Sequence, residues 1–336
     1  MNLQQLENLP PPPGVIGSLR VGFDVVSSHV WLILAPIAMD ILLWLGPRLG
    51  AGDLFSSMVT RLIELMAGAR PLPPQDIQTL NDTVEFFSRL NLLSWLRTFP
   101  VGISSLEAYA FQNDLQLQTP LGMPDVLQVG SVFNLAGCAI LLTVAGWIGG
   151  GLYFRSVSVT TLGAEEAGIS PLRAIAQTFI LSLGWTIAGL IILVPVAFIL
   201  GLLTAISPVL SNTILIVILL LSYWLIVPLF FMPHGIFAGK QNALYSVLSS
   251  LRMSRFTLPT SGLFVFSVFL LARGLSFLWS VPKNDSWMTL VGISGHAFIT
   301  TSLLAASFVY YRDMNVWIQS ALEQIQQKQS APTQQA

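Results

Sequence analysis

The chain has 336 residues, of which 54% are hydrophobic and only 9% are charged, and its formal net charge is −1. A soluble domain carries about 25% charged residues, so this chain has too few charges to solvate the surface of a soluble globule. Its balanced charge predicts no nucleic-acid partner. The single cysteine, Cys138, excludes an intramolecular disulfide.

The longest apolar stretch, residues 174–233, contains no Asp, Glu, Lys, Arg or His. A bilayer-spanning helix needs about 20 predominantly apolar residues. The stretch therefore predicts two membrane spans joined by a tight turn near Pro208. Similar segments elsewhere predict an all-α fold: a polytopic membrane helix bundle with about six transmembrane helices.

In chain order, residues 1–20 are expected to be a polar N-terminal tail, and 21–46 the first transmembrane helix. Residues 47–125 form the largest non-membrane block. Apolar residues recur there at helical spacing over 54–66, and a second helix is predicted over 76–97. Both are amphipathic and too polar to span, so we expect them to lie on the membrane surface or to cap the bundle. A re-entrant segment within 86–111 is the open alternative.

Residues 126–311 are predicted to hold five further transmembrane helices, followed by a C-terminal tail over 312–336. The predicted spans cover 129–154, 174–200, 209–231, 260–279 and 287–311. In the first of these, Gly146 and Gly150 have the G-x-x-x-G spacing that lets another helix approach closely. A phosphate-binding loop is disfavoured there, because no strand precedes these glycines.

The basic residues outside the long insertion gather on one side of the predicted spans. They are Arg20, Arg155, Arg173, Lys240, Arg252, Arg255, Arg312 and Lys328, whereas the short loops opposite contain chiefly Lys283. Cytoplasmic loops carry the excess of Lys and Arg. The sequence therefore predicts a multi-pass protein of the cell membrane, with both termini cytoplasmic and the 47–125 insertion extracytoplasmic.

Two segments carry a family resemblance. They are GVIGSLRVGFDVVSSHVWLILAPIAMDILLWL, over 14–45, and FMPHGIFAGKQNALYSVLSSLRMSRF, over 231–256. Both resemble multi-pass bacterial and archaeal proteins of unassigned function, related to the membrane domain of glycerophosphodiester phosphodiesterases. The resemblance implies a helical membrane domain and transfers no catalytic residue. No phosphodiesterase domain is attached to this chain, so that activity is not implied.

Three ionisable residues are predicted at similar depth in the outer half of the membrane: Asp40, Arg273 and His296. A charge near the middle of a spanning helix costs about 2.5–3.5 kcal/mol on insertion scales, so it normally faces a partner or a cavity. We expect these residues to form a buried polar cluster, with Arg273 paired to Asp40 and His296 as a neighbour. The alternative is that Arg273 extends to the outer headgroups.

The sequence predicts no metal site and no cofactor, because no set of ligands has metal spacing. The function favoured is a non-enzymatic scaffold, assembly factor or complex subunit, with membrane lipids, another membrane protein or a second copy of the chain as partners. The alternative is a transporter with a site near the bilayer midplane, since Pro195 and Pro228 can break spanning helices. A remote alternative is an intramembrane hydrolase, because residues 292–295 have the G-x-S-G pattern of rhomboid proteases.

Overall fold

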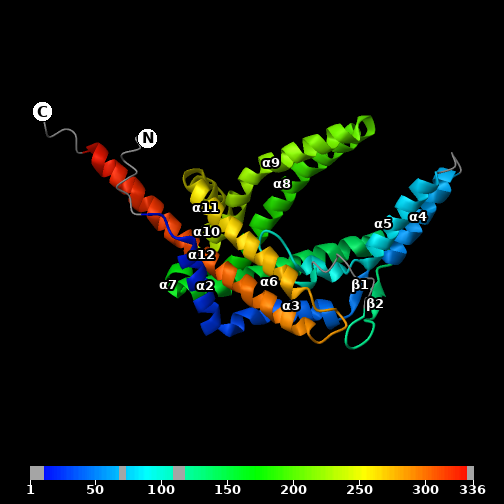
Figure 1. The fold of residues 1–336 in the computed structure, drawn as a ribbon, viewed down its shortest axis with the longest axis horizontal. Helices are drawn as coiled ribbons and strands as arrows, with labels where there is room; N and C mark the ends of the chain where they lie inside the picture. The colour runs from blue at the N-terminus through cyan, green and yellow to red at the C-terminus, as the bar shows by residue number, and fades with distance from the viewer. Residues whose placement is uncertain (1–10, 68–72, 109–117, 331–336) are drawn as a thin grey trace.

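The computed structural model describes residues 11–67, 73–108 and 118–330. This part of the chain is an all-α polytopic helix bundle from which two helical hairpins project (Figure 1). Four of its helices are long and apolar enough to cross a membrane, and two bent helix pairs raise the number to six if each pair is one span. The four are α6 (Val132–Leu162), α8 (Pro171–Ile206), α11 (Ala243–Trp279) and α12 (Thr289–Ser330).

The first predicted span is divided into two helices. The structure has α2 (Val15–Ser28), a 3₁₀ turn η1 (Val30–Ile33) and α3 (Leu34–Leu45), and the two halves meet at 95°. His29, with φ −131° and ψ 60°, interrupts the helix. Pro36 lies in the first turn of α3, where its missing N–H removes no intrahelical hydrogen bond. The sequence prediction of one helix over 21–46 missed this break, because the hydropathy of the segment is continuous across it.

The break lets α2 pack along α12, the most buried helix of the bundle. A Cβ atom at Gly22 would lie 2.6 Å from the backbone nitrogen of Ala306, so only glycine allows this close approach. Around the middle of α12, Ala305, Phe308 and Tyr310 are fully buried. Large apolar side chains of α6, α9, α10 and α11 complete this core.

The 47–125 insertion begins and ends at a short parallel ladder, β1 (Arg48–Gly50) with β2 (Val126–Gln128). Between them, α4 (Gly52–Ala67) and α5 (Pro74–Arg89) form a hairpin that projects from the bundle (Figure 1). Phe55 of α4 stacks on Phe87 of α5, with ring centroids 4.0 Å apart. The second predicted helix of the insertion, 76–97, ends earlier than expected, at Arg89.

After α5 the chain returns to the bundle. A 3₁₀ helix, η2 (Leu92–Leu96), packs against α6, and the following residues enter the space between the helices. We call residues 98–108 the inserted loop. Val101, Ser105 and Leu106 of this loop are buried, whereas connecting segments normally run over a protein surface. The inserted loop lies within the 86–111 segment for which the sequence left re-entry open.

The second projecting hairpin is formed by α8 and α9 (Pro208–Phe231). Ser207 caps α9 by accepting a hydrogen bond from the backbone of Leu210, and Pro208 fills the first helical position. Only the base of α8 is buried in the bundle, at Ala174, Thr178, Leu181 and Ser182. The distal part is apolar and exposed on both helices, as expected for a surface that faces lipid.

The last elements close the bundle. A short α10 (His234–Gly239) follows α9, and α11 carries a kink at Thr257, two residues before Pro259. Proline lacks the N–H that would bond the preceding turn, so the helix is interrupted there. Helix α12 continues without a break past position 311, where the sequence predicted the tail to begin.

Candidate functional site

The inserted loop meets four parts of the bundle around a partly open cavity of about 250 Å³. Most of its lining residues are apolar or aromatic. Among these lining residues, Phe99 alone is exposed. The lining comes from the loop, α6, the α9–α10 junction, α11 and α12. It consists of Phe99, Pro100, Gly102, Ser104, Tyr153, Phe154, Leu229, Phe230, Pro233, His234, Val268, Ala272, Thr300, Leu303, Leu304 and Ser307.

Two glycines of α6 make room for the loop that closes this cavity. A Cβ at Gly150 would lie 2.7 Å from Gly102 Cα, and one at Gly146 would lie 2.6 Å from Thr98 Cγ2. The sequence predicted that Gly146 and Gly150 let another helix approach. The structure instead places the backbone of residues 96–102 against them, because the chain after η2 lies along this face of α6.

Asp40 fixes the far end of the inserted loop. Its side chain is fully buried, and its carboxylate accepts hydrogen bonds from Ser105 Oγ, from Leu106 N (3.0 Å) and from Glu107 N (3.2 Å). Ser105 Oγ in turn accepts a hydrogen bond from Ala108 N, at 3.0 Å. A buried carboxylate with three donors is well satisfied, so Asp40 acts as an anchor for this loop.

His296 connects the same loop to two helices. Its Nε2 lies 3.2 Å from Ser104 Oγ of the loop, and its Nδ1 lies 3.2 Å from Ser276 Oγ of α11. The imidazole is buried on α12. Asp40 and His296 therefore bind neighbouring loop residues, as their predicted common depth suggested, although the loop serine that binds each of them was not foreseen.

Arg273 lies on the face of α11 that the structure leaves exposed. The hydrogen bonds to Asp40 come from the loop, and the guanidinium that interacts electrostatically with Asp40 is that of Arg97. Arg273 lies in an exposed position on α11, with its guanidinium carbon 6.0 Å from the ring centroid of Phe269. The inserted loop occupies the carboxylate of Asp40, and the predicted direct pair between Asp40 and Arg273 stays a prediction.

Further charged groups of the insertion gather next to this anchor. Burial and the neighbouring Arg273 lower the pKa of Arg97 to about 10, which leaves it protonated at neutral pH. Burial, and after it the negative charge of Asp40, raises the pKa of Glu107 to about 7, while Arg48 opposes this rise. Charged groups of both signs thus lie near Asp40.

His234 and Ser307 form a second polar contact inside the cavity wall. His234 Nε2 lies 2.7 Å from Ser307 Oγ, and both residues are buried. A serine–histidine pair also occurs in hydrolases, where a third group orients the histidine. In the described part of the chain no hydrogen bond or ion pair joins a carboxylate to His234. The contact therefore serves to tie α10 to α12, as the 2.8 Å contact of Tyr153 with Thr301 ties α6 to α12.

The G-x-S-G pattern does not form a comparable pair. Ser294 Oγ donates to the backbone oxygen of Leu290 in its own helix, at 2.8 Å. The neighbouring glycines accommodate Trp279: a Cβ at Gly295 would lie 2.8 Å from its indole ring. The motif packs α12 against the end of α11.

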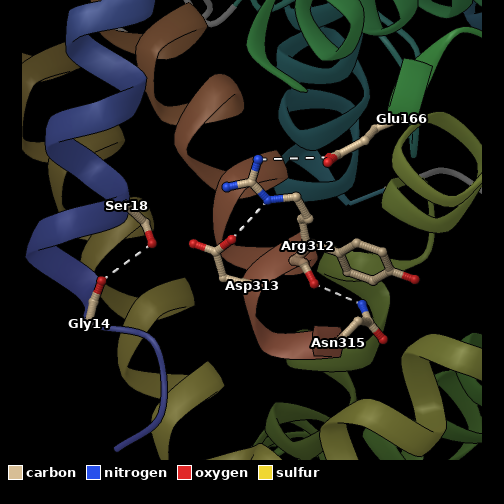
Figure 2. A network of polar contacts seen from close by, with 7 residues as sticks. Gly14, Ser18, Glu166, Arg312, Asp313 and Asn315 are labelled. Carbon is tan, nitrogen blue, oxygen red and sulfur yellow. Dashed lines mark hydrogen bonds and ion pairs between the residues drawn. The ribbon is translucent and has the colours of Figure 1, made fainter. Parts of the chain in front are cut away.

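A separate polar network lies at the opposite end of the bundle. Figure 2 shows Arg312 of α12 between Asp313, at 2.8 Å, and Glu166 of α7 (Ala164–Ala167), at 3.8 Å. Lys240 Nζ donates to the backbone oxygen of Glu165, and Arg173 donates to that of Lys240. Basic residues from three of the predicted cytoplasmic segments thus meet at one end.

The chain matches no protein-family model, and no curated protein or solved structure is significantly similar to it. The resemblance to the membrane domain of glycerophosphodiester phosphodiesterases therefore stays a prediction.

Sequence reasoning missed the cavity-lining Tyr153, His234 and Ser307 and the loop residues Ser104 and Ser105. Hydropathy does not reveal that a loop inserts between spans. One signal was present: residues 98–106 contain no charged side chain and several small residues, a composition that is compatible with burial.

Proposed function

We propose that this protein is a non-enzymatic integral membrane protein that binds a lipid, and that it serves as a scaffold, assembly factor or complex subunit. The observation that carries the proposal is the cavity of about 250 Å³ with its largely apolar lining. Ligand pockets are mostly apolar with a few polar groups, and the described cavity has that composition.

The way the cavity is closed supports this proposal. The inserted loop is held by Asp40 at one end and by the glycines of α6 at the other, so the site is largely preformed. Phe99, which is 57% exposed, contacts Trp185 of α8 with ring centroids 5.6 Å apart. Entry past Phe99 would come from the lipid side, between the loop and the projecting hairpin.

The orientation proposed for the chain has both termini in the cytoplasm of a cell-membrane protein. The basic residues that meet near Arg312 support it, because positively charged segments remain on the cytoplasmic side. In this orientation the inserted loop and the α4–α5 hairpin are extracytoplasmic.

A transporter is the second candidate function. The observation that favours it is the presence of two bent helix pairs. Discontinuous helices often form the substrate sites of transporters. In the second bent pair, the helical segment 224–239 contributes residues to the cavity lining. The sharper break, at His29, contributes no residue to that lining. Binding is therefore favoured over translocation.

The test fills the cavity. Ala272→Trp places an indole in the lining, whereas Leu270→Trp, two residues earlier on α11, adds one at an exposed, lipid-facing position. Each variant is purified in mild detergent, and retained lipids are counted by native mass spectrometry. We expect wild type and Leu270→Trp to retain lipid, and Ala272→Trp to lose most of it.

Equal lipid retention by Ala272→Trp and Leu270→Trp would overturn the proposal. Overpacking costs about 1–3 kcal/mol, so thermal unfolding of both variants is measured in parallel. If Ala272→Trp does not fold, Ala272→Leu provides a smaller filling of the same space. Substrate accumulation in proteoliposomes that depends on the cavity would favour the transporter instead.

A further inference from the structure

The cavity offers a ligand a surface without a full charge. Among the described residues that line it, none is Asp, Glu, Lys or Arg. Its largest lining side chains are aromatic, on Phe99, Tyr153, Phe154 and Phe230. An ionised group placed inside would lose its water without gaining an opposite charge, and such a transfer is costly. The lining therefore disfavours a charged headgroup in the interior.

The polar side chains of the lining already have partners in the protein. The pairs within hydrogen-bond distance are Ser104 with His296, Tyr153 with Thr301, His234 with Ser307, Thr300 with the backbone oxygen of His296, and Ser307 with that of Leu304. The hydroxyls of Thr300 and Ser307 donate within their own helix, so their hydrogens are not free for a ligand. The second ring nitrogen of His234, Nδ1, is inaccessible even to a water-sized group. A polar group in the cavity would find few donors, and an unpaired buried polar group costs free energy.

Phe99 marks the open side of the cavity. Its side chain is 57% exposed, whereas the other lining residues are buried or half-buried. Its ring lies against Trp185 of α8, with centroids 5.6 Å apart. Helices α6, α8 and α11 around this opening are long and apolar enough to cross a membrane, so a lipid beside them presents hydrocarbon. One acyl chain can enter here sideways while its headgroup stays outside.

The size of the cavity limits how much of a chain it can hold. A methylene group is close in size to a water molecule, whose share of liquid volume is about 30 Å³. A cavity of about 250 Å³, divided by roughly 30 Å³ per group, holds about eight methylene groups. This length corresponds to part of one acyl chain and leaves no room for both chains of a phospholipid.

We propose that the cavity recognises the end of one acyl chain of a membrane lipid, over about eight carbons, and that the headgroup lies outside it, beyond Phe99. The inference rests on the proposed lipid-binding function and adds which part of the lipid is recognised. Binding then depends on the hydrocarbon chain and is independent of the headgroup, because every charged group of the lipid stays out of the cavity.

The experiment maps the chain in a bilayer. Wild-type protein is reconstituted into phosphatidylcholine vesicles that contain a small fraction of phosphatidylcholine with a photoreactive diazirine at one defined acyl carbon. After illumination, the labelled residues are identified by peptide mass spectrometry. A diazirine at the chain end is expected to label the interior residues Tyr153, Phe230 and Leu304. A diazirine more than about eight carbons from the chain end is expected to label Phe99 or Trp185 instead.

Labelling of lipid-facing residues provides the internal control. Ile191 and Leu193 of α8 are exposed on the projecting hairpin and meet lipid whether or not the cavity is filled. Ala272→Trp is expected to lose most of the interior labelling and to keep the labelling of α8, whereas Leu270→Trp keeps both. If Ala272→Trp does not fold, Ala272→Leu takes its place.

Two further arms test the headgroup and the source of the chain. The same photoreactive chain on phosphatidylglycerol is expected to label the interior to the same extent as on phosphatidylcholine. A phosphocholine that carries a methyl-branched isoprenyl chain with a photoreactive end is the alternative source, and stronger interior labelling by this probe would overturn the acyl assignment.

The outcomes are distinguishable. A strong dependence on the headgroup, or interior labelling by carbons next to the headgroup, would overturn this inference and leave the lipid-binding proposal standing. The same holds if no probe labels the interior of wild type while Ala272→Trp still loses its retained lipid in native mass spectrometry. Absence of both effects would overturn the proposed function as well.

Discussion

At the scale of single residues, Asp40 shows how a charge is accommodated within a spanning segment. The cost of burying an unpaired charge is high. Here the carboxylate accepts hydrogen bonds from Ser105 and from two backbone N–H groups of the inserted loop. These hydrogen bonds offset the cost of burying the carboxylate, and they also hold the inserted loop in place.

Replacing Asp40 with alanine should detach the far end of the loop. Three donors, on Ser105, Leu106 and Glu107, would lose their acceptor, and each buried unsatisfied donor costs about 1–3 kcal/mol. We expect a loss of about 3 kcal/mol or more in stability, measured by thermal unfolding in detergent, with Asp40→Asn less affected because it keeps one carbonyl oxygen.

Asp24→Ala is the control, because Asp24 is exposed on α2 and its side chain makes only a 3.8 Å ion pair with Arg20. Exposed substitutions of this kind usually change stability by less than about 0.5 kcal/mol. An Asp40→Ala protein that unfolds at the same temperature as Asp24→Ala would show that the anchor is unimportant.

At the scale of elements, the inserted loop and α6 depend on each other. The loop has no regular backbone hydrogen bonding of its own between 98 and 105, so its path is set by what it packs against. Gly146 and Gly150 give it a flat helix face, and Gly102 gives the loop a backbone without a side chain at the closest point. This arrangement brings Phe99 and Ser104 into the cavity lining.

Gly150→Ala should displace the loop, since its new methyl group would lie 2.7 Å from Gly102 Cα and backbone must move. Overpacking of this kind costs about 1–3 kcal/mol. We expect a lower unfolding temperature together with reduced lipid retention. Gly137→Ala, in the same helix, is the matched control, because a Cβ there meets nothing within 4 Å.

The control substitution is expected to be neutral or to stabilise α6 by up to about 1 kcal/mol through helix propensity. If Gly150→Ala bound as much lipid and unfolded at the same temperature as Gly137→Ala, the close packing of the loop on α6 would not be needed for lipid binding.

At the scale of the whole molecule, the two ends of the bundle differ in chemistry. One end gathers Arg173, Lys240 and Arg312, and the other carries the long insertion with its loop, ladder and hairpin. The apolar α8–α9 hairpin projects between them (Figure 1). This asymmetry is the basis of the proposed orientation.

The proposed orientation is tested by cysteine labelling in a Cys138→Ala background. A membrane-impermeant maleimide applied to intact cells should modify Gln118→Cys in the insertion, and should modify Glu323→Cys on α12 only after permeabilisation. Both positions are exposed, so access through protein is not limiting. Labelling of both from the same side would contradict the proposed topology.

The sequence by itself determined the class of the protein. The scarcity of charge and the apolar stretches are properties of the chain read in one dimension, and they suffice to predict an all-α membrane bundle with about six spans. The same reading predicted a buried cluster of Asp40, Arg273 and His296; Asp40 and His296 are buried, whereas Arg273 is exposed.

Only the tertiary structure decided what those residues contact. Facing direction and the path of a polar loop do not follow from hydropathy, so the sequence paired Asp40 with Arg273 and assigned Gly146 and Gly150 to another helix. In the structure the inserted loop takes both places, because its backbone donors satisfy the carboxylate and its Gly102 fits against the glycines of α6. The physical reason is that burial requires every polar group to find a partner, and that partner came from a distant segment of the chain.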